Sequence, residues 1–147
     1  MENLRFRAWD KEDKRMKEVF NIDFHRFTAI VGFRLSEPKS FLSNDPLIII
    51  QSTGLKDKNG VEIFENNIVN VHEFINVGGI EGYNEGEKET IGIIKYDCLY
   101  DSPIPEWYLQ TKDDCISFSY IDLHEESFEV LGNQFEHTHL LKEWLGW

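Results

Sequence analysis

The sequence predicts a mainly β protein with one short helix near its C-terminal end. Runs of β-branched and aromatic residues recur roughly every 8–12 residues, the spacing of strands in a small barrel or sandwich. Asn59-Gly60 lies between two such runs and is a strong hairpin signal. Near the end of the chain, the apolar residues change to the 3.6-residue period of a helix.

The N-terminal third contains several predicted strands. Leu4 to Trp9 alternates apolar and polar positions, as a half-buried strand does, and Met16 to Phe20 follows after a polar turn. Residues 20–35 fit two patterns, because their phenylalanines have helical spacing while the segment is also rich in β-branched and aromatic residues. We expect strands there. Ser36 to Asp45 has the composition of a loop.

A core hairpin over residues 47–74 is the element around which the chain is organised. Leu47 to Gln51 is its apolar first strand, and Ile68 to Val71 begins a later one. Asn59 and Gly60 are predicted to form the structural turn between them. We expect type I′, in which both central residues need a positive φ that glycine and asparagine tolerate.

The second half of the chain continues the β pattern. Residues 76–89 contain four glycines and four glutamates, so we interpret them as a mobile acidic loop at a hairpin tip. Leu140, Leu141, Trp144 and Leu145 share one helical face and predict a terminal helix at about 138–145. Further strands are predicted at Thr90–Tyr96, Glu106–Gln110, Ile116–Tyr120 and Phe128–Leu131.

Length and composition predict a single folded domain over residues 1–147. Hydrophobic residues make up 41% of the chain and aromatic residues 14%, whereas disordered chains are poor in both. The net charge of −12 repels phosphate, so we expect no nucleic-acid partner. No segment resembles a signal peptide or a membrane span. Cys98 and Cys115 are interpreted as reduced thiols, with a disulfide between them as the alternative. We therefore expect a cytoplasmic protein.

Neither a catalytic nor a metal-binding constellation emerges. His137 and His139 could join His124 at a metal, but zinc needs three or four ligands in firm geometry, and the pair is two residues apart near a predicted helix. Acidic pairs such as Asp113-Asp114 point to opposite faces of a strand rather than into one cleft. We expect no cofactor, no metal and no catalytic residue.

Three blocks of the sequence carry a family resemblance: Arg5 to Met16, Gln51 to Val69, and Glu129 to Leu141. In this order they resemble the YopX family of phage and prophage proteins, with its TGL-x-D-x-x-G-x-x-I hairpin. Glu65-Asn66-Asn67 departs from that family's usual Glu-Gly-Asp, and His137-Thr138-His139 stands where an Asn-Pro is common. The resemblance implies a small SH3-like barrel with extra strands, a phage or prophage origin and the cytoplasm of a bacterial host.

We expect an accessory protein without catalytic activity that self-associates or binds a host or phage protein. A metal-dependent hydrolase and a nucleic-acid-binding barrel are the alternatives, and the net charge disfavours the second. Consecutive residues on a strand face opposite sides, so one ring of Trp107-Tyr108 is expected to point away from the core. The candidate contact residues are Trp9, Asp57, Asn59, Glu65, Trp107 and Tyr108.

Overall fold

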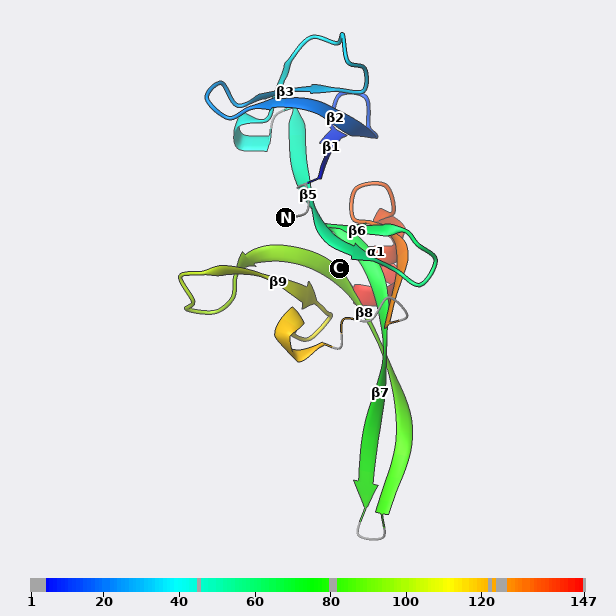
Figure 1. Ribbon diagram of the computed structural model, residues 1–147. Coiled ribbons are helices and arrows are strands. Elements are labelled where there is room, and N and C mark those ends of the chain that lie inside the picture. The colour runs from blue at the N-terminus through cyan, green and yellow to red at the C-terminus, as the bar shows by residue number, and fades with distance from the viewer. Residues whose placement is uncertain (1–4, 45, 80–81, 122, 124–126, 147) are drawn as a thin grey trace. The chain divides into compact units, whose positions relative to one another are not determined.

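A computed structural model describes residues 5–44, 46–79, 82–121, 123 and 127–146 (Figure 1). Contacts within the chain divide it into two compact units, Met1–Gly54 and Leu55–Trp147. The predicted mainly β class is confirmed, with two antiparallel sheets and one short α-helix. The elements are β1 (Phe6–Asp10), β2 (Arg15–Asp23), β3 (Thr28–Val31), β4 (Lys39–Ser40), β5 (Leu47–Lys56), β6 (Glu62–Phe64), β7 (Asn67–Gly79), β8 (Gly82–Cys98), β9 (Pro105–Gln110), β10 (Cys115–Ser117), β11 (Phe128–Asn133) and α1 (Thr138–Leu145), with 3₁₀ helices at Leu42–Asn44 and Phe118–Tyr120.

The strands of the first unit follow the order β4-β3-β2-β1-β5. Residues 20–35 form the end of β2 and all of β3, which confirms strands over the helical alternative. The strand period buries Ala29 and Val31 beside Val19 and Ile22. The phenylalanines at helical spacing are instead exposed.

A buried carboxylate closes the turn after β1. Asp10 accepts hydrogen bonds from the main-chain N–H groups of Glu12 and Asp13, and from the Nζ atoms of Lys17 at 3.0 Å and Lys39 at 2.8 Å. Burial alone would raise the pKa of Asp10, but these hydrogen bonds outweigh it and hold the pKa well below its ordinary value. The Asp10 carboxylate therefore holds the β1–β2 turn and, through Lys39, the β4 strand.

The second unit is built on a sheet with the order β10-β9-β8-β7-β11. One face buries a core that includes Val69, Ile94, Leu109 and Phe128. On the other face, Ile68 and Ile93 pack against Leu140 and Leu145 of α1. The helix thus has the bounds expected from its apolar spacing, and it ends at Gly146, which has a φ of 69°.

The turn after β5 differs from the predicted type I′ hairpin. Gly60 donates its N–H to the carbonyl of Asp57 at 3.0 Å, which places Lys58 and Asn59 at the centre of the turn. Gly60 has a φ of 79°, whereas neither central residue has a positive φ. The Asp57 carboxylate accepts the N–H groups of Asn59 and Val61 at 2.9 and 2.8 Å, so side-chain hydrogen bonds select this turn. Asn59 and Gly60 lie in the turn as predicted, but type I′ was wrong.

The segment 76–89 is not the loop that its composition suggests. The β7–β8 ladder runs without a break from Ile68 opposite Ile93 to Gly79 opposite Gly82. Antiparallel pairing uses main-chain N–H and C=O groups, which glycine and glutamate also carry. Because the apolar residues near Ile68 and Ile93 fix the register, the ladder continues from them as far as Gly79 and Gly82. The loop prediction is therefore corrected to paired strands for residues 76–79 and 82–89, the described part of that range.

The predicted SH3-like barrel is not seen as a closed structure. Over the described residues both sheets are open, with β4 and β6 at the edges of one and β10 and β11 at the edges of the other. Among the helices of that part of the chain, none is long and apolar enough to cross a membrane.

Candidate interaction surfaces

The β2–β3 hairpin of the first unit presents a strained aromatic connection. The Asp23 carboxylate accepts the N–H groups of His25 at 2.9 Å and Arg26 at 3.1 Å, which folds the chain back over four residues. Phe27 ends this connection with a φ of 54°. A non-glycine residue there carries about 1–2 kcal/mol of strain, so the surrounding contacts must hold it in place.

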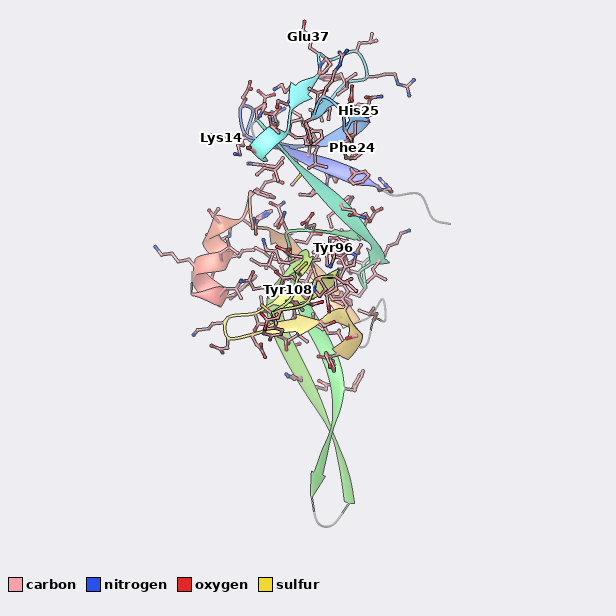
Figure 2. The ribbon with its side chains drawn as sticks, turned by 90° about the vertical axis from the view of Figure 1, so that its left-hand side faces the viewer. Lys14, Phe24, His25, Glu37, Tyr96 and Tyr108 are labelled. Atoms are coloured by element: carbon pink, nitrogen blue, oxygen red, sulfur yellow. The ribbon has the colours of Figure 1, made fainter. Side chains whose placement is uncertain are left out.

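Two exposed phenylalanines of this hairpin pack against a third phenylalanine, which follows β4. Phe24 is 64% exposed and Phe27 is 44% exposed. Their ring centroids lie 6.2 and 6.0 Å from that of Phe41, in edge-to-face geometry. Phe41 packs against the core of the unit, so the exposed rings have a fixed base. Figure 2 shows Phe24 and His25 on this hairpin.

A groove of about 380 Å³ lies beside Phe24. Phe6, Phe20 and Phe24 supply its aromatic lining, and Arg5 and Glu18 its charged groups. The β2–β3 register shifts at Phe20, and such a bulge redirects a side chain relative to a regular strand. We call the groove, together with Phe24 and Phe27, the Phe24 surface. Its volume and aromatic lining suit an inserted apolar group.

Trp9 is the candidate contact residue that lies in the first unit. It is half-buried on β1, opposite Met16 of β2 and Ile48 of β5. Alternation along β1 therefore places it on the sheet face opposite the buried Ala8. Trp9 is not among the residues that line the groove beside Phe24.

Asp57 and Asn59 meet in the turn after β5. Asp57 is only 2% exposed, and its second carboxylate oxygen accepts the Val130 N–H at 2.9 Å. The Lys58 N–H donates to the Phe128 carbonyl at 2.9 Å. These bonds cover main-chain groups of the edge strand β11 and so shield it from pairing with another chain. Asn59 is exposed in the same turn.

Two asparagine side chains hold the turn that follows Glu65. Asn66 has a φ of 70°, the conformation that glycine would adopt, and its side chain accepts Lys95 Nζ at 2.9 Å. Lys95 also donates to Gln134 Oε1 at 2.8 Å. Asn67 Oδ1 accepts the Phe64 N–H at 2.8 Å, as a carboxylate would. The two amides therefore preserve the local turn.

Trp107 and Tyr108 point to opposite faces of β9. Trp107 packs against the core, with its ring centroid 6.4 Å from that of Phe118 and 4.9 Å from that of Tyr96. Tyr108 lies on the other face, opposite Lys95 in the β8–β9 ladder. Burial raises the pKa of Tyr108, and the charges of Cys115, Asp97 and Glu65 add to it. Burial lowers the pKa of Lys95, and Glu65 opposes that change. Glu65, Lys95 and Tyr108 therefore share one electrostatic environment.

The histidines and cysteines are not gathered at a common centre in the part of the chain that the structure describes. His137 Nδ1 accepts the Asn133 N–H at 3.1 Å, and its ring lies 6.2 Å from that of His139. His124 lies outside the described residues. Within those residues, no group of three or more potential metal ligands is found. Cys98 and Cys115 are both free thiols.

The Phe24 surface was not among the predicted contact residues. The sequence signal was present, because three phenylalanines fall between residues 20 and 27 beside His25 and Arg26. Their exposure follows from the bulge and the turn, which a strand pattern does not reveal.

Comparison with known proteins places this architecture in a family. No curated protein matches the chain. The crystal structure of protein EF1440 from Enterococcus faecalis is 22% identical, covers 96% of this chain and 99% of its own, and has a TM-score of 0.46. The family model described as YopX protein matches residues 5–142, from before β1 into α1. The chain therefore belongs to the YopX family.

Proposed function

We propose that this chain is a protein-interaction domain without catalytic activity, and that the Phe24 surface contacts the partner. The observation that carries the proposal is the exposed aromatic rim of the 380 Å³ groove. In the phage or prophage setting that the family resemblance implies, the partner is a second copy of the chain, or a host or phage protein, in the bacterial cytoplasm.

The energetics of the exposed rings support a contact. Phe20 is 47% exposed and Phe24 is 64% exposed, on the same groove. A phenylalanine buries about 150–250 Å² when covered, so removing half of each ring from water contributes roughly 2–3 kcal/mol per ring at about 25 cal/mol per Å². Two such rings supply the central apolar anchor that protein interfaces use.

The proposal is tested by replacing Phe24 with serine and comparing it with Phe33→Ser. Phe33 is 78% exposed in the same unit but does not line the groove, so it controls for loss of an exposed ring. Each immobilised variant is incubated with bacterial lysate, and bound proteins are quantified against wild type. A band lost with Phe24→Ser and kept with Phe33→Ser supports the proposal. Equal retention by all three proteins, with equal melting temperatures, contradicts it.

The same variants separate the two alternative functions. His25 and Arg26 lie beside exposed rings, and basic and aromatic side chains are the groups with which other proteins bind single-stranded nucleic acid. Fluorescence anisotropy with a labelled single strand, over a salt series, measures that directly. Binding that depends on Phe24 and weakens with salt would favour a nucleic-acid role. Activity toward phosphate esters that appears only with added divalent metal would favour a hydrolase.

A further inference from the structure

We propose that the Phe24 surface receives Phe74 from a second copy of this chain. Phe74 lies on the arm, which we define as the paired residues 72–79 of β7 and 82–89 of β8. The inference rests on the proposed function of the Phe24 surface and names its occupant.

The arm is a ribbon without a third strand among the described residues. The β11 ladder on β7 ends where Phe128 meets Val71, and the β9 ladder on β8 reaches only to Ile93. From His72 opposite Glu89 outward, β7 and β8 pair only with each other. Figure 1 shows these paired ends extending beyond the other strands of their sheet. A two-stranded ribbon is marginally stable in water, so docking on another surface would stabilise it.

Phe74 is the apolar anchor that this arm offers. It is 78% exposed, and its ring centroid lies 5.2 Å from that of His72. The Nε2 atom of His72 and the Oε2 atom of Glu87 lie 3.6 Å apart, so these two side chains are neighbours on the arm. Glu87 lies opposite Phe74 in the ladder and Glu89 lies opposite His72, so both glutamates share the face of the ribbon that carries Phe74. The arm therefore presents one large ring beside His72, with two carboxylates on the same face.

The groove has the complementary size and lining. Its volume of about 380 Å³ is lined by three phenylalanines, which offer edge-to-face contacts to an inserted ring. Arg5 in the same lining carries the charge opposite to that of the carboxylates that flank Phe74. Glu18, the acidic residue of the lining, lies 3.6 Å from Arg7. The lining thus suits an aromatic side chain with acidic neighbours.

The distribution of charge favours contact between unlike units of two copies. Residues 1–54 contain nine of the 15 basic residues and eight of the 27 acidic ones. The other unit holds 19 acidic and six basic residues. Contact between two arms would bring two acidic units together, and their like charges would repel. Contact between an arm and the Phe24 surface instead brings an acidic unit against a nearly neutral one. The chain itself therefore carries a ligand of the required chemistry.

The first experiment is the solution mass of the full chain by light scattering over a concentration series. We expect a mass above that of the 17.3 kDa monomer. Phe74→Ser and Phe24→Ser should each weaken association at least tenfold, while Phe33→Ser leaves it unchanged. Association should also weaken with added salt. A wild-type protein that stays monomeric at all concentrations overturns the inference.

A mixing experiment makes the assignment specific. Phe74→Ser retains an intact groove and Phe24→Ser retains an intact arm, so an equimolar mixture should recover one arm–groove contact and form mixed dimers. Fluorescently labelled samples in analytical ultracentrifugation would show them. Mixtures that associate no better than either variant alone overturn the proposal. So does association that survives Phe74→Ser, with equal melting temperatures.

The result also separates this inference from the proposed function. If Phe24→Ser abolishes lysate binding while the wild-type chain is monomeric, the surface binds another protein and the arm assignment fails. If Phe24→Ser changes neither self-association nor lysate binding, both proposals fail.

Discussion

Replacing Asp57 with alanine should cost about 3–4 kcal/mol of unfolding free energy. The carboxylate accepts three main-chain N–H groups, from Asn59, Val61 and Val130, at 2.8–2.9 Å. A hydrogen bond to a charged group contributes about 1.5–3 kcal/mol, and leaving a buried donor unpaired adds to the loss. Water can replace the two bonds within the exposed turn more easily than the one to Val130. Asp57→Asn keeps one oxygen acceptor but turns an N–H toward a donor, so we expect about half that loss.

The assay is urea unfolding at neutral pH, combined with hydrogen exchange of the Val130 amide. Asn59→Ala is the matched control, because its exposed side chain is removed while the main-chain N–H that Asp57 accepts remains. That control should stay within about 0.5 kcal/mol of wild type. The reasoning is refuted if Asp57→Ala loses less than about 1 kcal/mol and Val130 keeps its protection from exchange.

Two further predictions concern the other polar clusters. Asn66→Gly should stay within about 1 kcal/mol of wild type because glycine suits its φ of 70°, whereas Asn66→Val should lose about 2 kcal/mol or more, and thermal unfolding of the two variants tests this order. Asp10 has a lowered pKa, so its contribution is complete above about pH 4 and is lost as the pH falls toward the folded-state value. Asp10→Asn should therefore be less stable than wild type at pH 7, and its unfolding free energy should fall less than that of wild type between pH 4 and 2. Parallel curves of unfolding free energy against pH would contradict the role of this carboxylate.

The periodic parts of the fold could be predicted because their signals are local. Period-2 alternation indicated the strand around Ala8, and a β-branched run after a break in the chain indicated the strand around Val69. The apolar spacing of Leu140 and Leu145 indicated α1 at its observed bounds. The loop prediction for residues 76–89 failed because their structure depends on pairing rather than on a local signal. Their glycines and glutamates have low strand propensity, but pairing between two chain segments overrides such a preference.

The candidate site was less accessible from sequence than the fold. The contact residues predicted from family blocks include Asp57, which proves to be buried, while the exposed Phe24 and Phe74 were not selected. Exposure depends on which face of a strand meets the core, and the bulge at Phe20 changes that face. A single-residue shift of this kind leaves composition and spacing unchanged.

The sequence by itself determined the β class, the position of the turn at Asn59-Gly60 and the terminal helix, because backbone geometry and side-chain period act over a few residues. Tertiary structure decided the rest. Asp57 finds its partner Val130 73 residues along the chain, and that carboxylate selects the turn type. The ribbon carrying Phe74 exists because β7 and β8 pair far beyond their neighbours. Burial and strand pairing depend on what distant segments supply, and local patterns do not contain that information.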